Sequence, residues 1–83
     1  DAEREIVKAG NETESRLVQI FEKALRIKPL GITDNLLKMG ADSLSLFVAF
    51  NEVQKLAGKK FDIDQIMENH TIKDIAKHLD ELS

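Results

Sequence analysis

The 83-residue sequence contains no cysteine, no tryptophan and no tyrosine, and only one proline. The lack of cysteine excludes disulfides, thiolate zinc sites and cysteine nucleophiles, and it fits a reducing compartment, so we expect a cytoplasmic location. Phenylalanine is the only aromatic residue type, which leaves no stacking platform for bases or sugars. No apolar run approaches the roughly 20 residues that span a bilayer, and no signal peptide opens the chain, so no membrane association is expected.

Length and charge narrow the functional classes further. A chain of 83 residues forms one domain with a small core, which disfavours a self-sufficient enzyme with a deep cleft. The formal net charge of −3 argues against nucleic-acid binding. Hydrophobic residues make up 42% and charged residues 33% of the chain, and these proportions indicate a folded domain rather than a disordered tail.

The spacing of apolar residues predicts an all-α fold. We expect a small bundle of three main helices plus one short helix, with a long loop between the first and second helices. Residues 1–12 are mostly charged or small and are expected to be a linker or disordered lead-in, while residues 13–83 form the domain. The first helix follows Thr13, with Asn11 or Thr13 as its N-cap, and Pro29 ends it. Its apolar stripe is Leu17, Ile20, Phe21, Ala24 and Leu25.

Residues 29–41 are expected to be a long loop that packs on the core through Leu30, Ile32, Leu36, Leu37 and Met39. A loop of this length is uncommon in so small a domain and is often functional. The second helix spans residues 43–57, between an N-cap at Asp42 and a stop at Gly58. The residues of this helix expected to face the core are Leu44, Phe47, Phe50 and Val53. The spacing also allows Leu46 and Leu56 on this face.

The C-terminal part of the chain is expected to hold the short helix, at residues 61–67, and the last helix. Thr71 is the expected N-cap of the last helix, with Asp74 at the capping-box position. The buried face of this helix is predicted to consist of Ile72, Ile75, Ala76 and Leu79.

The most informative segment is residues 39–44, Met-Gly-Ala-Asp-Ser-Leu. Gly40 allows a tight turn, Asp42 caps the second helix, and the Ser43 hydroxyl then lies at the helix N-terminus. Unpaired N–H groups and the helix dipole favour an anion there, so a phosphate esterified to Ser43 would be well placed. From these residues alone, a plain helix cap remains the more common explanation.

Residues 40–44, Gly-Ala-Asp-Ser-Leu, resemble the attachment motif of acyl and peptidyl carrier proteins. Residues 32–39 are similar to the segment that leads into that motif, and residues 68–79 resemble the last helix of the family. The resemblance implies that Ser43 carries 4′-phosphopantetheine, which is added by a phosphopantetheinyl transferase and holds an acyl intermediate as a thioester. It also implies that Asp42 serves in transferase recognition as well as in capping, and that the domain is itself non-catalytic.

The motif looks more like polyketide carriers than peptidyl ones, so we expect a polyketide or hybrid synthase and partners such as a ketosynthase or acyltransferase. A peptidyl carrier of a nonribosomal peptide synthetase is the alternative, followed by an unmodified helical adaptor. A serine nucleophile would need a base, and neither histidine is near Ser43 in sequence. As an excised domain the chain is expected to be monomeric.

Partner contacts are assigned to Leu44, Leu46 and Val48. For Leu44, the residue just after the serine, this role is what the resemblance implies. Leu46, Val48 and Ala49 cannot all be buried with Leu44, Phe47 and Phe50 on one helical face, which favours an apolar docking patch unless the long loop covers that face. Leu44 could equally be a core residue. The second helix has few acidic residues, so we expect partner binding to depend on apolar contact and only weakly on salt.

No metal site is expected. His70 and His78 are too far apart in sequence to form a close helical pair, and Asp74 adds no third convergent ligand. The Asp62-x-Asp64 pair starts like a calcium loop but lacks the glycine that such loops require.

Overall fold

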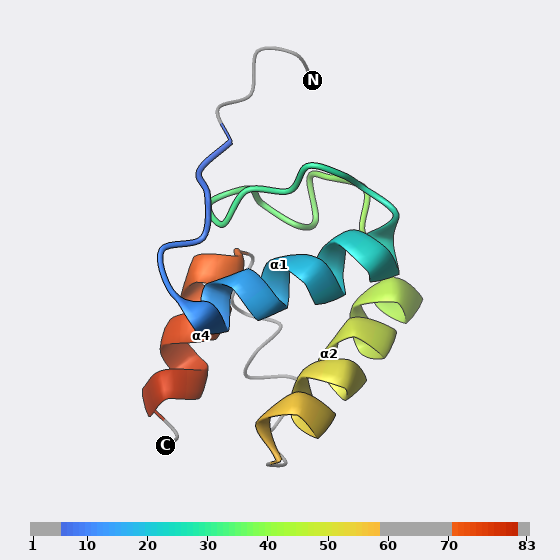
Figure 1. The fold of residues 1–83 in the computed structure, drawn as a ribbon. Helices are drawn as coiled ribbons and strands as arrows, with labels where there is room; N and C mark the ends of the chain where they lie inside the picture. The colour runs from blue at the N-terminus through green and yellow to red at the C-terminus, as the bar shows by residue number, and fades with distance from the viewer. Residues whose placement is uncertain (1–5, 59–70, 82–83) are drawn as a thin grey trace.

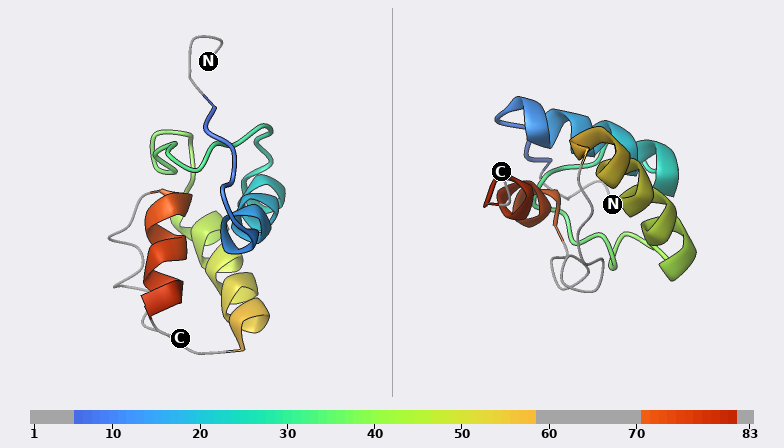
Figure 2. Two further views of the ribbon diagram at one scale, coloured as in Figure 1. Left: turned by 60° about the vertical axis from the view of Figure 1, so that its left-hand side comes forward. Right: turned by 90° about the horizontal axis from the view of Figure 1, so that it is seen from below.

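The computed structural model describes residues 6–58 and 71–81, which contain three α-helices and no strand. α1 spans Glu12–Leu25, α2 spans Ser43–Ala57 and α4 spans Ile72–Glu81. Figure 1 shows α1 lying against both other helices. The segment that joins α1 to α2 covers the end of the bundle where α2 and α4 begin (Figure 2). The predicted all-α fold is confirmed, while the short helix predicted at residues 61–67 lies outside the described residues.

The ends of α1 are set by side chains on its first turn and by a left-handed residue at its end. Asn11 is the N-cap, and its Oδ1 accepts a hydrogen bond of 2.8 Å from the Glu14 N–H. The Glu14 side chain also caps the chain before the helix, because its Oε1 accepts a hydrogen bond of 2.7 Å from the Gly10 N–H. The helix ends at Leu25 because Arg26 adopts φ 57°, ψ 39°. Termination therefore occurs before Pro29, the residue that the sequence had suggested as the helix breaker.

The caps predicted for the other two helices are confirmed. Asp42 Oδ1 accepts from the Ser45 N–H at 2.7 Å at the start of α2. Gly58 ends that helix with φ 67°, and its N–H donates to the Gln54 carbonyl at 3.0 Å. At the start of α4, Thr71 Oγ1 accepts from the Asp74 N–H at 3.2 Å.

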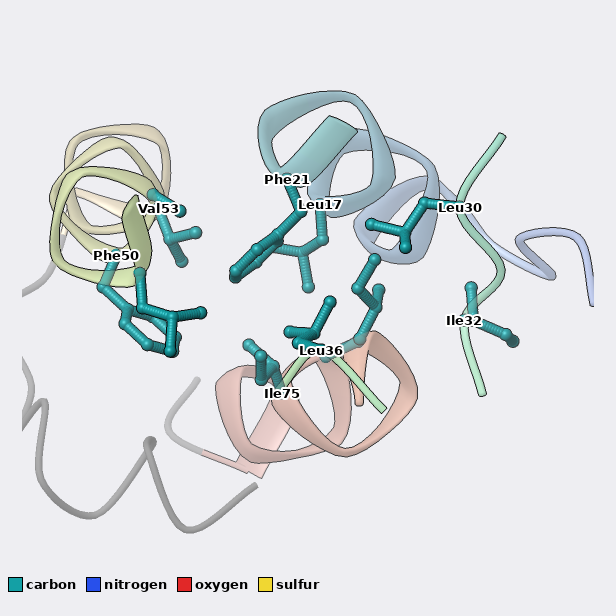
Figure 3. Packing of buried hydrophobic residues seen from close by; sticks show 12 residues of the cluster. Leu17, Phe21, Leu30, Ile32, Leu36, Phe50, Val53 and Ile75 are labelled. Atoms are coloured by element: carbon teal, nitrogen blue, oxygen red, sulfur yellow. The ribbon is translucent and has the colours of Figure 1, made fainter. Parts of the chain in front are cut away.

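One cluster of buried apolar side chains joins all three helices and the loop (Figure 3). Phe21 of α1 and Phe50 of α2 meet edge to face, with ring centroids 5.7 Å apart and planes at 81°. Leu36 of the loop is also buried in this cluster. The remaining buried apolar members are Leu17, Leu30, Ile32, Leu46, Ala49, Val53, Ile72, Ile75 and Ala76.

The buried stripe of α2 differs from the predicted one. The helix buries Leu46, Ala49, Phe50 and Val53, while Phe47 is 52% exposed. The predicted stripe stepped by three residues throughout, and such a repeat drifts by about 60° per step on a helix of 3.6 residues per turn. Leu44 and Val53 are therefore about 180° apart around the helix axis, so they cannot share one buried face.

The segment before α1 is attached to the fold more closely than a linker would be. Val7 and Ala9 pack against the core cluster, and the Val7 carbonyl accepts a hydrogen bond of 2.9 Å from the Ile32 N–H. The Ile32 carbonyl in turn accepts from the Lys73 N–H of α4 at 2.9 Å. Val7 and Ala9 thus contact the folded unit, and Glu12 already belongs to α1. The boundary expected after residue 12 stays a prediction.

Candidate functional site

Ser43 is the first residue of α2, and its side chain is exposed at the helix N-terminus. The chain reaches it through Gly40, which has φ 96°, a conformation that favours glycine. A Cβ added to Gly40 would meet no atom within 4 Å, so this glycine serves the turn rather than close packing. The sequence predicted the turn, the cap and the position of the serine at the start of the helix, and the structure adds that its side chain is exposed.

A short turn anchors the segment that delivers Ser43. Asn35 Oδ1 accepts hydrogen bonds from the Leu37 and Lys38 N–H groups at 3.0 and 3.2 Å. Leu36 is buried, and its carbonyl accepts from the Ala41 N–H at 3.3 Å. The serine is therefore exposed, but the chain just before it is fixed to the core.

The electrostatics at the start of α2 suit a covalently held anion. Hydrogen bonds from the Ser45 N–H and then the Ser45 hydroxyl lower the pKa of Asp42 below its usual value. Asp42 thus accepts from the N–H of Ser45 and also interacts with the N–H of Leu44, whereas the N–H of Ser43 has no acceptor within the helix. Unpaired N–H groups at a helix start attract negative charge on a group attached next to them.

Apolar side chains beside Ser43 form a solvent-exposed surface, which we call the α2 patch. It consists of Leu44, Phe47 and Val48, which are 72%, 52% and 48% exposed. Residues three and four apart on a helix share a face, so the three side chains are neighbours. Leu46, which the sequence assigned to partner contacts, is only 5% exposed and belongs to the core. Leu44 is resolved as a surface residue rather than a core one.

Phe47 is the surface residue that sequence reasoning missed, because its size and apolar character placed it in the core. The signal that could have found it is the alternative stripe through Leu46, Ala49 and Val53, which stays on one face of the helix. Leu37 in the loop is also exposed, at 48%, although it was expected to pack down.

The described part of the chain gives no indication of a metal site or of a membrane-spanning helix. Among residues 6–58 and 71–81, no group of three or more histidine and carboxylate side chains could hold a metal ion. His70, Asp62 and Asp64, considered earlier as ligands, lie outside these ranges. Over the same ranges, no helix combines the length and apolar character that crossing a membrane requires.

Comparison with known proteins identifies the family. The family described as "Phosphopantetheine attachment site" matches residues 15–79. Tyrocidine synthase 3 of Brevibacillus parabrevis is 32% identical over 75 residues, which cover 90% of this chain and 1% of that protein. Gramicidin S synthase 2 of Brevibacillus brevis is 30% identical over 76 residues, which cover 92% of this chain and 2% of that protein. The chain therefore spans about one to two per cent of the length of these curated relatives.

Solved structures agree with this family. An active-site mutant peptidyl carrier protein has a TM-score of 0.84 and 25% identity, covering 95% of this chain and 88% of its own. McyG A-PCP complexed with phenylalanyl-adenylate has a TM-score of 0.81 and 22% identity, covering 94% of this chain and 12% of its own, and supports the fold.

The chain belongs to the phosphopantetheine attachment family and is a carrier domain. Members of this family carry 4′-phosphopantetheine covalently. The residues at the start of α2 fit such a group, because the exposed Ser43 hydroxyl lies at the first position of the helix, next to first-turn N–H groups. Domains of this kind are non-catalytic tethers.

Proposed function

We propose that Ser43 is the residue to which 4′-phosphopantetheine is attached. The observation that carries this proposal is the exposed serine at the first position of a capped helix, within a family match that covers residues 15–79. Ser45, the nearest other hydroxyl, is half-buried and bonded to the Asp42 carboxylate. Ser43 is therefore the better acceptor of the two.

The attached group supplies a terminal thiol, on which an intermediate is held as a thioester. This accounts for a thioester carrier whose own sequence has no cysteine. The chain's own residues present the arm: Asp42 fixes the start of α2, and Leu36 fixes the preceding loop to the core. Tethering raises the local concentration of the intermediate at each partner's active site.

We infer that the cargo is a peptidyl or aminoacyl group. The likeness to a peptidyl carrier protein and to tyrocidine and gramicidin S synthases favours the alternative that the sequence left open. The polyketide assignment expected from the motif is unconfirmed, and with it the ketosynthase and acyltransferase partners. A domain that forms an aminoacyl adenylate is the better candidate partner, by analogy with McyG A-PCP.

Partner recognition is proposed to use the α2 patch beside Ser43. A phosphopantetheinyl transferase and later partner domains must approach this end of α2 to reach the serine. Leu44 and Val48 keep the contact role predicted for them, Phe47 joins them, and Asp42 is retained as a transferase contact. The cytoplasmic location and the monomeric state stay predictions.

Intact-mass measurement tests the attachment residue. After incubation with coenzyme A and a broad-specificity phosphopantetheinyl transferase, the wild-type chain should gain one phosphopantetheinyl group. Ser43→Ala should gain none, whereas the matched control Ser45→Ala should gain one. Modification of Ser43→Ala, or loss of modification only in Ser45→Ala, would overturn the assignment. An unmodified wild-type chain would favour the adaptor instead.

A further inference from the structure

A groove of about 910 Å³ lies between α1 and α2. Its floor is apolar and contains Ile20 and Ala24 of α1 with Val48 and Leu56 of α2. Ile20 and Ala24 are half-buried, while Val48 and Leu56 are 48% and 45% exposed. The groove therefore leaves apolar surface in water that a binding segment could cover.

The rim of this groove is cationic, although the whole chain has a net charge of −3. Arg16 and Lys23 of α1 line it, together with Arg26 just after that helix and Lys55 of α2, and Glu52 is its one acidic lining residue. Arg16 is paired with Glu12 at 2.6 Å, and Lys55 lies 3.9 Å from Glu52. Within the part of the chain that the structure describes, Lys23 and Arg26 form no ion pair.

Lys23 lies in the last turn of α1, and Arg26 is the residue that directly follows this helix. The C-terminal turns of α1 lie beside the first half of α2 in Figure 1, and the view from below in Figure 2 agrees. Val48 belongs both to the groove and to the α2 patch with Leu44 and Phe47. The groove is thus continuous with the surface that faces a partner at Ser43.

We propose that this groove binds an acidic, amphipathic segment of a partner domain, and this proposal rests on the carrier function. Apolar side chains of the segment cover Val48, Ile20 and Leu56, while its carboxylates pair with Lys23 and Arg26. Charge complementarity of this kind selects the partner and orients it more than it adds raw affinity.

The same charges disfavour the other occupants. A basic partner segment would place like charges against Lys23 and Arg26. Two copies related by a two-fold axis would bring the same patch of each copy together, and so would oppose these cations to one another. Nucleic acid is disfavoured because the whole chain is acidic and has no tryptophan or tyrosine for stacking.

A peptide selection tests the proposal without assuming a particular partner. The probe is a phage-displayed library of random peptides, selected on the full chain at low ionic strength. Enriched peptides should combine aspartate or glutamate with leucine, isoleucine or phenylalanine. Lys23→Glu/Arg26→Glu should weaken binding of the best peptide by about tenfold or more. The matched control Lys73→Glu/Lys77→Glu makes the same charge change on exposed positions of α4 and should stay within about twofold, because these cations are outside the groove.

Several results would overturn the groove proposal. They are enrichment of no peptide, enrichment of peptides without acidic residues, and equal weakening in both double variants. Sedimentation that shows dimerisation abolished only by Lys23→Glu/Arg26→Glu would assign the groove to a second copy instead. The mass gained when Ser43 receives phosphopantetheine is measured on the same protein samples. A chain that is modified but binds no acidic peptide would refute the groove proposal and leave the carrier function intact.

Discussion

Leu44 and Leu46 are the same residue type, two positions apart on α2, in opposite environments. Leu44 is 72% exposed beside Ser43, whereas Leu46 is 5% exposed and packs in the core cluster. A step of two residues turns an α-helix by about 200°, so these side chains leave the helix on nearly opposite sides. A surface role is therefore open to Leu44 and closed to Leu46.

Aspartate substitution should separate the two leucines. Leu46→Asp places an unpaired carboxylate in the core, and burial of an unpaired charge is strongly unfavourable, so the chain should be largely unfolded. Leu44→Asp should keep a melting temperature close to that of the wild type, because the new carboxylate remains in water. Circular-dichroism melts of both variants provide the measurement.

The same pair also tests the partner contact. Folded Leu44→Asp should transfer its cargo to or from a cognate partner more slowly than the wild type, because an apolar contact at the α2 patch is lost. A Leu46→Asp protein that melts like the wild type would contradict the burial of Leu46. Unimpaired transfer by Leu44→Asp would remove Leu44 from the contact surface.

At the level of the helix, the Asp42 cap should make α2 sensitive to acid. Hydrogen bonds from Ser45 favour the ionised carboxylate and lower its pKa in the folded chain. A lowered folded pKa gives stability that is fully present above the unfolded value of about 3.9 and is lost as the pH falls through the folded value. The cap should therefore act fully at neutral pH.

Asp42→Asn isolates this contribution, because asparagine can cap the helix without a charge. The wild type should melt at a higher temperature than Asp42→Asn at neutral pH, and the difference should shrink as the pH is lowered toward about 3. Thermal melts of both proteins across this range measure it. A difference that is constant with pH would mean that ionisation of Asp42 does not stabilise the helix.

The loop between α1 and α2 depends on the absence of a side chain at Gly31. A Cβ at this position would lie 2.9 Å from the Val7 nitrogen and 3.3 Å from its carbonyl oxygen, so backbone must move. We expect Gly31→Ala to destabilise the fold by about 1–3 kcal/mol. It should also speed exchange of the Ile32 amide hydrogen, which donates to Val7.

Gly10→Ala is the control for this prediction, because its Cβ would meet only the Glu14 Oε1 at an ordinary 3.4 Å. Thermal melts and hydrogen exchange compare the two variants. If Gly31→Ala matched Gly10→Ala in both measurements, residues 6–9 would not be held against the loop as the structure has them.

On the scale of the whole molecule, stability depends on one small core. Phe50 is 1% exposed and meets Phe21 edge to face. Phe50→Ala should cost about 3–5 kcal/mol through lost burial and a cavity. A small domain has roughly 5 kcal/mol of stability in total, so largely unfolded protein is expected in a circular-dichroism melt. Phe47→Ala is the control and should melt near the wild type, because Phe47 is half exposed.

The distribution of charge over the molecule also differs from what single helices suggest. With α2 considered alone, salt was expected to have little effect on partner binding. In the folded chain Lys23 of α1 and Arg26 just after it line the same groove as Val48 of α2, so an acidic segment in the groove should bind less tightly as salt is added. Contacts made only at the α2 patch should remain nearly independent of salt.

Much of the fold followed from local rules. Asp42, Gly58 and Thr71 were predicted as caps, because capping depends on residues within one turn of the helix end. The predicted faces of α1 and α4 are confirmed for Leu17, Phe21, Ile72, Ile75 and Ala76, which are buried. The other predicted members, Ile20, Ala24, Leu25 and Leu79, are half-buried and pack against the core. Few apolar residues compete for these two faces. In α2 apolar residues surround much of the helix, so periodicity allowed two stripes, and the wrong one was chosen for Phe47 and Leu46.

Apolar periodicity and local capping patterns were enough to predict the helical fold, the turn before α2 and the place of Ser43 at the start of that helix, because each depends mainly on near neighbours in the chain. The packed structure was needed to show which face of α2 is buried, that Val7 pairs with Ile32, and that Lys23 and Arg26 line a groove with Val48 of α2. These features join residues far apart in sequence. They depend on how α1, α2, α4 and the loop pack, and the pattern of one segment does not contain that information.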